Sequence, residues 1–361
     1  MRIVTFGEIM MRLAAPGFQR FRQCLPGSLD VTFAGAEANV AASLAMLGAE
    51  ASFVSAIPDH SIADACIGSL RNVGVDTQWI LRRQGRLGIY FLETGANQRP
   101  SQVVYDRDHS AVGLTSGSEY PWKDILAGAD WFHVTGITPA ISQTAAEATL
   151  TAVQAAQAAG VRVSCDLNFR KKLWRWDKSV SPQQLAERTM RQVLPHVDVV
   201  IANEEDCHDV LQIQAADTDV HAGKLNVQRY PDVASQLVQQ FPNVSKVAIT
   251  LRESYSASHN NWGAMLYAAA DQQAYFAPLA NGEYQPYEIK SIVDRVGGGD
   301  SFGAGLIFAM LSEQHSSDQD AIRFATAASC LAHSISGDFN FSKRSEVEAL
   351  MGGSASGRVV R

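Results

Sequence analysis

The sequence predicts an α/β protein in which a central, mostly parallel β-sheet is flanked by helices and accompanied by a small β-sheet lid. Short apolar runs alternate with longer helical stretches over most of the 361 residues, which is typical of a parallel sheet wrapped by helices. Apolar residues form 46% of the chain and charged residues 19%, enough for a large core. Two early segments break the alternation, and their composition indicates a second, separate sheet.

The expected elements of the main body follow from hydrophobic patterning. Strands are predicted where short apolar runs occur, at 3–6, 51–56, 131–134, 162–166, 197–202 and 246–250. Helices are predicted at 38–47, 142–159, 182–194 and 233–240. The polar stretches 214–230 and 253–261 are expected to be surface excursions. One domain is therefore expected over 1–350, followed by a disordered tail at 351–361 with the linker composition Gly-Gly-Ser-Ala-Ser-Gly.

The segments 10–33 and 86–112 are the two that break the alternation. Both are rich in β-branched and aromatic residues, Gly, Pro and Arg, and they contain period-two stretches such as 87–92. A sheet inserted at two places must lie beside the main body, because it would otherwise interrupt the parallel core. We expect it to be a lid over a ligand cleft, and a pair of hairpins without such a role is the alternative.

Composition and charge exclude several classes of protein. The net charge is −7 and no run of five or more Lys and Arg occurs, which argues against a nucleic-acid partner. No signal-peptide pattern follows Met1, and the apolar runs are far shorter than the roughly 20 residues that span a membrane. We therefore expect a cytoplasmic protein without a membrane partner. The five cysteines are scattered and form no CxxC pair, which favours reduced packing residues over disulfides or a zinc site.

The strongest local signal is a glycine-rich turn at 294–300, Asp-Arg-Val-Gly-Gly-Gly-Asp, followed by an apolar helical run. Gly297, Gly298 and Gly299 let backbone N–H groups converge, and a helix that begins near Asp300 adds the positive end of its dipole. This turn can therefore hold an anion such as a transferring phosphoryl group. A carboxylate beside bound phosphates is explained if Asp300 takes the proton from an incoming hydroxyl. The alternative is that Asp300 is the N-cap of the helix.

This turn resembles the C-terminal signature of the ribokinase-like (PfkB) carbohydrate kinase family, a Gly-rich turn of the form D-T-x-G-A-G-D. The resemblance implies a ribokinase-like fold, ATP with Mg²⁺ as the phosphoryl donor, an anion hole formed by the glycines, and Asp300 as the catalytic base. Arg295 and Gly298 depart from the family pattern but keep the flexibility of the turn and its terminal Asp. In several members the first Asp of the signature helps to hold a monovalent cation, which implicates Asp294 and K⁺.

A second family mark lies at 33–41, Phe-Ala-Gly-Ala-Glu-Ala-Asn-Val-Ala, which resembles the signature G-G-x-x-x-N-x-A. There Gly35 lets a substrate approach the backbone, and Asn39 can offer a donor and an acceptor to sugar hydroxyls. Together with Ala36, these residues are expected to bind the substrate. An ordinary helix start with a capping Asn is the alternative.

Smaller pieces fit the nucleotide side of the same scheme. The sequence Asn-Glu-Glu-Asp at 203–206 resembles the family's N-x-x-E element, which implies that Asp206 acts on Mg²⁺ through water; a solvated acidic helix start is the alternative. Thr-Leu-Arg at 250–252 resembles the nucleotide-binding T-x-G turn, and a surface hairpin is the alternative. The nucleotide-binding residues expected from the resemblance are Asn168, Asn203, Thr250, Arg252, Gly263, Gly297 and Gly299.

The residues expected to face the substrate favour a sugar acid. Tyr90, Tyr105 and Arg107 lie in the second lid segment, and Arg170 follows a strand end, where ligands of open α/β sheets bind. Two guanidinium groups suit a carboxylate, whereas a neutral sugar needs only hydroxyl partners. This pattern, with Asp338 in the late Gly-Asp-Phe-Asn segment, resembles that of the 2-keto-3-deoxygluconate kinases within the family. The alternative is that both arginines form lid ion pairs or contact ATP.

The resemblance thus implies transfer of the γ-phosphoryl group of ATP to the primary hydroxyl of 2-keto-3-deoxygluconate, which gives the 6-phosphate. Kinases for fructose, a nucleoside or another sugar acid are alternatives, and so is a non-catalytic sugar-acid sensor. The edges and outer face of a lid sheet need cover, so a homodimer formed through the lid is expected.

Overall fold

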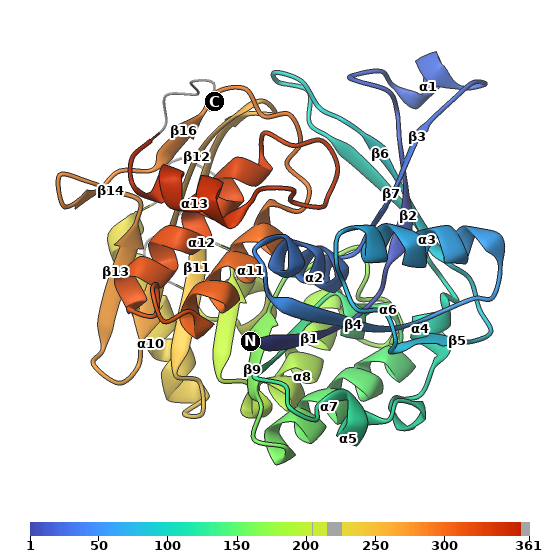
Figure 1. Cartoon of the computed structure of the whole chain (residues 1–361), viewed down its shortest axis with the longest axis horizontal. Coiled ribbons are helices and arrows are strands. Elements are labelled where there is room, and N and C mark those ends of the chain that lie inside the picture. The colour runs from blue at the N-terminus through green and yellow to red at the C-terminus, as the bar shows by residue number, and fades with distance from the viewer. Residues whose placement is uncertain (204, 215–225, 355–361) are drawn as a thin grey trace.

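The computed structural model describes residues 1–203, 205–214 and 226–354, and a large sheet runs through this part of the chain (Figure 1). Its strands lie in the order β13-β12-β11-β10-β9-β8-β1-β4-β5, and β16 also pairs with β12. Pairing is parallel from β11 to β5 and antiparallel where β12 meets β11, β13 and β16. The strands are β1 (Arg2–Phe6), β4 (Glu50–Ile57), β5 (Ile80–Arg82), β8 (Trp131–Thr135), β9 (Arg162–Asp166), β10 (Val199–Ala202), β11 (Lys246–Ser256), β12 (His259–Ala268), β13 (Gln273–Ala277) and β16 (Tyr287–Ile289).

Helices cover both faces of this sheet and divide the core in two. One core is closed by α2 (Ala36–Met46), α3 (Ser61–Asn72), α11 (Gly298–Leu311), α12 (Asp318–Ala332) and α13 (Arg344–Met351). The other is closed by α4 (Ala111–Leu114), α5 (Trp122–Ile125), α6 (Thr138–Ile141), α7 (Gln143–Ala158), α8 (Pro182–Val193), α9 (Asp206–Leu211) and α10 (Tyr230–Gln240). In β10, Val199 and Ile201 enter the first core, while Val200 and Ala202 enter the second. Burial on both faces explains why these strands are continuous apolar runs in the sequence.

Four strands form a second, smaller sheet that projects from the main body (Figure 1). Strands β2 (Met10–Ala14) and β3 (Asp30–Ala34) come from the first early segment, and β6 (Gly88–Glu93) and β7 (Gln102–Asp106) come from the second. The two segments join through parallel pairing of β2 with β6. The inner face buries Met10, Tyr90 and Leu92, whereas Val31 and Val104 are more than half exposed on the sheet. This is the separate sheet that the sequence predicts.

Short elements make up the remaining secondary structure of the described residues. They are α1 (Phe21–Cys24) in the first lid segment, the 3-10 helices Gly117–Glu119, Leu194–His196 and Val227–Arg229, and a small ribbon of β14 (Leu279–Ala280) and β15 (Glu283–Tyr284).

The predicted strands and helices of the main body are found, with ends that move by up to three residues except in β11. That strand continues to Ser256 and forms a long hairpin with β12, so the surface excursion predicted at 253–261 is the end of a β-hairpin, where Tyr255 is exposed. The hairpin pairs Thr250 with Ala264 and Arg252 with Trp262. Of the excursion predicted at 214–230, residues 215–225 lie outside the described residues, and α10 begins at Tyr230. Of the predicted tail, α13 reaches Met351 and residues 355–361 lie outside the described residues.

Among the described residues, none of the helices combines the length and the apolar character that a membrane span requires. All five cysteines are free, and three of them are buried, Cys66, Cys165 and Cys207. Burial raises the pKa of the Cys66 thiol to about 12, so this side chain stays neutral and acts in packing.

Candidate active site

A cavity of about 370 Å³ lies where the lid meets the carboxyl ends of the central strands. Strand β9 ends there at Asp166, β10 ends there at Ala202, and the lid contributes Tyr90 and Tyr105. Ligands of open α/β sheets bind at such an edge. The predicted site residues that line the cavity are Gly35, Ala36, Asn39, Tyr90, Tyr105, Arg107, Asn168, Arg170, Asn203, Asp206, Thr250, Arg252, Gly297, Gly299, Asp300 and Asp338. Three predicted residues are not part of its lining, namely Gly263, Asp294 and Gly298.

The glycine-rich turn leads directly into α11. Its N-cap is Gly297, whose φ of +83° lies in the left-handed region that favours glycine. The N–H of Ser301 donates to the carbonyl of Gly297 (2.9 Å), so the N–H groups of Gly298, Gly299 and Asp300 have no acceptor in a preceding helical turn. Free N–H donors at a helix start can bind an anion, so the geometry is compatible with the predicted anion hole. Asp300 is the third residue of the helix, so the alternative that it is the N-cap is wrong.

Asp300 is buried and is oriented by Asn39 of α2. The Asn39 Nδ2 donates to Asp300 Oδ2 (2.7 Å), and the Asn39 Oδ1 accepts from the N–H of Gly35 (3.2 Å). Burial raises the pKa of Asp300 to about 6, although the bond from Asn39 and the charge of Arg170 oppose that rise. A carboxylate with this pKa is ionised at neutral pH but can accept a proton readily. The Asn39 amide therefore has a defined role besides the predicted substrate contact, since it positions Asp300.

A second physical reason, besides the predicted approach of a substrate, requires glycine at position 35. A Cβ at this position would lie 1.9 Å from the backbone oxygen of Glu8, so only glycine fits between α2 and the residues after β1. Its backbone is extended, with φ near 180°, and carries no strain. The close approach of the chain itself therefore requires this glycine.

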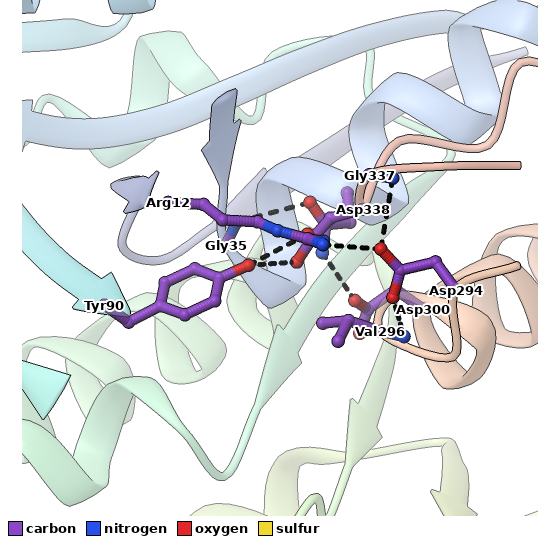
Figure 2. A network of polar contacts seen from close by, with 9 residues as sticks. Arg12, Gly35, Tyr90, Asp294, Val296, Asp300, Gly337 and Asp338 are labelled. Carbon is purple, nitrogen blue, oxygen red and sulfur yellow. Dashed lines mark hydrogen bonds and ion pairs between the residues drawn. The ribbon is translucent and has the colours of Figure 1, made fainter. Parts of the chain in front are cut away.

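Asp338 joins the lid to the main body, as Figure 2 shows. The hydroxyl of Tyr90 lies 2.8 and 2.7 Å from the two Asp338 carboxylate oxygens, and the guanidinium of Arg12 forms an ion pair with the same group. Burial raises the pKa of Asp338, while Arg12 and Tyr90 lower it. Arg12 was not among the predicted residues, and it also contacts Asp294.

The two predicted arginines differ in their surroundings. Arg107 is 4% exposed and forms an ion pair with Glu8, which is 3% exposed, so the alternative of a lid ion pair holds for this contact. Among the described residues, the Arg107 Nε has no hydrogen-bond partner, so the side chain keeps a donor next to the cavity. Arg170 is exposed, and its Nη1 donates to the neighbouring carbonyl of Phe169 (3.0 Å). Its charge lowers the pKa of Asp300, Asp166 and Asp206, which places it close to the acidic side of the cavity.

Two carboxylates gather at the ends of β9 and β10. Asp206 accepts from the N–H groups of Phe169 (3.0 Å) and Asn203 (2.9 Å), and it is buried rather than solvated. Burial and the charge of Asp206 raise the pKa of Asp166 well above its usual range. Glu204, which belongs to the same sequence element, lies outside the described residues. The cavity thus brings two buried carboxyl groups together on this side, although the described residues contain no group of three His, Cys, Asp or Glu that could hold a metal ion on its own.

The predicted nucleotide turn at 250–252 is instead part of the β11–β12 hairpin. Both Thr250 and Arg252 line the cavity from this strand. Gly263 does not reach the cavity, because a Cβ there would lie 2.2 Å from the hydroxyl of Tyr284, which covers it. The expectation of a T-x-G turn is therefore wrong in its geometry, and the alternative of a hairpin is what the chain forms.

Comparison with known proteins identifies the family. Residues 1–251 match the family described as pfkB family carbohydrate kinase. The chain belongs to this family. A 2-dehydro-3-deoxygalactonokinase of Haloferax volcanii is 31% identical over 355 residues, which cover 98% of both proteins. The crystal structure of a 2-dehydro-3-deoxygluconokinase from Thermotoga maritima is 44% identical, with a TM-score of 0.88 over 98% of this chain and 100% of that one. A putative 2-keto-3-deoxygluconate kinase from Enterococcus faecalis, 25% identical, superposes with a TM-score of 0.85 over 100% and 99% of the two chains.

Beneath the cavity, this kinase buries a carboxyl that sequence reasoning did not select. Glu37 of α2 is 0% exposed, and its Oε1 accepts from the hydroxyls of Thr135 (2.7 Å) and Thr138 (2.8 Å). Burial raises its pKa to about 7, and the nearby charge of Asp300 adds to the rise. A Cβ at Gly7 would lie 2.1 Å from the Glu37 Oε2, so the chain leaves space for this side chain. Glu37 is therefore mostly neutral near pH 6 and supports the floor of the site.

Besides Glu37, the charged residues Glu8, Asp166 and Arg295 line the cavity without having been predicted as site residues. Arg12 does not line it, but it bonds to the lining residue Asp338 and was also missed. Glu8 and Asp166 had a weak signal, since Glu8 closely follows the predicted strand 3–6 and Asp166 ends the predicted strand 162–166. Arg12 had none, because its partner Asp338 is 326 residues further along the chain.

Proposed function

We propose that this carbohydrate kinase transfers the γ-phosphoryl group of ATP to the primary hydroxyl of 2-keto-3-deoxygluconate, which gives the 6-phosphate. One observation carries the proposal most. The buried carboxylate of Asp300, at the start of α11, shares a single cavity with Arg107, Arg170 and the two lid tyrosines. The proposed substrate has a reacting hydroxyl and a carboxylate. The hydroxyl would lie beside Asp300 and the anion site, and the carboxylate would lie beside the guanidinium groups.

Asp300 is proposed to take the hydroxyl proton as the oxygen attacks the phosphorus. Its pKa of about 6 leaves it ionised at neutral pH, and Asn39 keeps the accepting oxygen in a fixed position. The N–H groups of Gly299 and Asp300, which line the cavity, would stabilise with the helix dipole the charge that develops on the transferred phosphoryl group. Placing Tyr90 and Tyr105 on the lid lets its closure exclude water, which otherwise competes as acceptor.

The choice of a sugar acid rests on the arginines and on the relatives. Arg107 and Arg170 are expected to bind the substrate carboxylate, and Asp338, Tyr90, Gly35 and Ala36 are expected to contact the sugar hydroxyls. The relatives named above act, by their names, on 2-keto-3-deoxy sugar acids. One of them is named a 2-dehydro-3-deoxygalactonokinase, so 2-keto-3-deoxygalactonate is a second candidate substrate.

The nucleotide is proposed to bind across the ends of β10 and β11. Asn168, Asn203, Thr250 and Arg252 line that side of the cavity, and Arg252 can pair with phosphate oxygens. The paired carboxyl groups of Asp166 and Asp206 fit a Mg²⁺ ion that arrives with the nucleotide, because the cation would favour their ionised forms and Mg²⁺ binds carboxylates through its retained waters as well as directly. When bound, this ion neutralises charge on the β- and γ-phosphates.

A coupled ADP-release assay tests the proposal. MgATP is supplied with 2-keto-3-deoxygluconate, 2-keto-3-deoxygalactonate, gluconate, fructose or ribose. Turnover restricted to the two keto-deoxy acids is expected. Turnover on fructose or ribose alone would still show a sugar kinase, but it would overturn the assignment of Arg107 and Arg170 to a substrate carboxylate. Binding of the acids without any ADP release would instead support the sensor alternative.

We also propose that the lid forms a homodimer. Several apolar side chains of the lid segments are exposed, Phe18 (55%), Leu25 (43%), Val31 (56%) and Val104 (55%). An open four-stranded sheet has two edges and an outer face that need cover. Sedimentation of the unmodified protein as a dimer, and of the Val104→Asp variant as a monomer, is expected; a monomeric unmodified protein would contradict this.

A further inference from the structure

The side chain of Arg12 reaches from the lid into the main body. Arg12 in β2 lies beside Tyr90 of β6 in the register of the lid sheet, and both are 4% exposed. Its guanidinium is bonded to Asp338 by Nη1 and to Asp294 by Nη2, and the two carboxylates are also buried (Figure 2). One lid residue therefore holds two acidic side chains of the main body at once.

These two acidic residues belong to loops that shape the proposed phosphoryl-transfer site. Asp294 opens the glycine-rich turn, and its carboxylate accepts from the N–H groups of Val296 (3.1 Å) and Gly337 (3.2 Å). The turn and the loop of Asp338 touch, since a Cβ at Gly297 would lie 2.3 Å from the Asp338 carbonyl oxygen. The guanidinium of Arg12 thus fixes the lid, the glycine-rich turn and the Asp338 loop relative to one another.

The surroundings of Asp294 do not fit the monovalent cation that the family resemblance implies. Arg12 already supplies a positive charge at the Asp294 carboxylate, and burial keeps that pair out of water. A second cation, Arg295, interacts with the same carboxylate and donates to the carbonyls of Ser256 (3.1 Å) and Ala257 (2.6 Å). A potassium ion at Asp294 would therefore meet like charges at short range in a poorly hydrated place, which is unfavourable.

We propose that Arg12 is a positioning residue of this kinase and that its guanidinium takes the place of a monovalent cation at Asp294. It acts through Asp294 and Asp338 and aligns the glycine-rich turn with the substrate side of the cavity when the lid is in place. The inference rests on the proposed phosphoryl transfer, since it assigns Arg12 to the same site. It makes the reaction independent of potassium.

The first test uses the unmodified protein and needs no variant. Thermal unfolding and ADP release are measured in potassium chloride, sodium chloride and choline chloride at equal ionic strength. A cation that binds the folded state raises the unfolding temperature with its concentration. We expect equal unfolding temperatures and equal rates in the three salts. A rise in unfolding temperature, or an increase in rate of more than threefold, that is specific to potassium would overturn the proposal.

The second test removes the side chain. Arg12→Ala should lower kcat about a hundredfold, the effect of a misplaced site, while the KM for ATP changes little. Millimolar guanidinium should restore part of kcat and should raise the unfolding temperature of this variant, because it refills the place between Asp294 and Asp338. Arg12→Lys should be intermediate, because a single ammonium group does not bridge two carboxylates as the guanidinium fork does.

The matched control is Arg86→Ala. Arg86 forms a two-pronged pair with Asp106 in the same lid region (2.8 and 2.8 Å), but the pair is about half exposed, so its loss should change little. An unchanged kcat in Arg12→Ala, or an equal response of both variants to guanidinium, would overturn the proposal. The response of the unfolding temperature does not depend on turnover. If the protein turns over none of the sugars, the proposed function is contradicted. The effect of guanidinium on the unfolding temperature of Arg12→Ala then still decides the role of Arg12.

Discussion

The hydrogen bond from Asn39 to Asp300 predicts how the pH dependence of the reaction changes in a variant. In the unmodified kinase, kcat/KM should fall as the pH drops through about 6, where the buried Asp300 takes up a proton and can no longer act as a base. Asn39→Ala removes a donor that stabilises the ionised form. A hydrogen bond to a charged group contributes about 1.5–3 kcal/mol, which corresponds to roughly one to two pKa units. The acid limb of the profile should therefore move from about 6 towards about 7 or 8.

The assay is ADP release at low substrate concentration between pH 5 and pH 9, with 2-keto-3-deoxygluconate and MgATP. Asn243→Ala is the matched control, because its amide donates to the carbonyls of Leu194 (2.8 Å) and Val197 (2.7 Å), outside the cavity lining. Its acid limb should stay where that of the unmodified kinase is. An Asn39→Ala profile that has the same acid limb, merely lowered at every pH, would refute the reasoning.

Three further predictions concern the sugar end, the floor and the turn of the site. Arg170→Ala should raise the KM for the sugar acid about ten- to a hundredfold and the KM for ATP far less, because a charge-assisted bond to the carboxylate is lost. Steady-state kinetics with each substrate varied in turn would show an equal rise in both KM values if the assignment is wrong. Neutral Glu37 contributes stability that is present below its ordinary pKa of 4.5 and is lost as the pH rises through about 7. The free energy of unfolding of Glu37→Gln should therefore rise by about 2.5 kcal/mol relative to that of the unmodified protein between pH 5 and pH 8. Urea unfolding at each pH measures this difference, and a constant difference would contradict the reasoning. Gly297→Ala should lower the free energy of unfolding by about 1–3 kcal/mol and remove most of kcat, because the new Cβ strains a left-handed backbone and clashes with the Asp338 carbonyl. If the substitution left unfolding and activity unchanged, this geometry of the turn would be excluded.

Local features of this chain were predictable because their physical causes are local. The strand Arg162–Asp166 was predicted with its observed bounds, since both of its faces are buried and its sequence is a short apolar run. The glycine-rich turn before Asp300 was predictable because only glycine tolerates the backbone of Gly297. The lid was predictable because period-two stretches interrupt the alternation of strands and helices.

Other features depend on contacts that the local sequence does not encode. The extension of β11 to Ser256 depends on pairing with β12. The residues from Arg252 onward are mostly polar, so hydrophobic patterning does not indicate a strand there. The alternative of Asp300 as the N-cap of α11 was weighed because Asp is a common N-cap, but Gly297, three residues earlier, takes that position. The bonds of Asn39 with Asp300 and of Arg12 with Asp338 join residues 261 and 326 positions apart, and no periodicity reports such pairs.

The central claim is that Asp300 is the base of a sugar-acid kinase. The most direct measurement compares the unmodified protein and Asp300→Asn in ADP release with MgATP and 2-keto-3-deoxygluconate, with binding of the acid followed by calorimetry. The asparagine keeps the shape of the side chain but cannot accept the proton, so kcat should fall by about 10²–10⁴ while binding changes little. A variant that keeps more than a tenth of the kcat would contradict the assignment of the base.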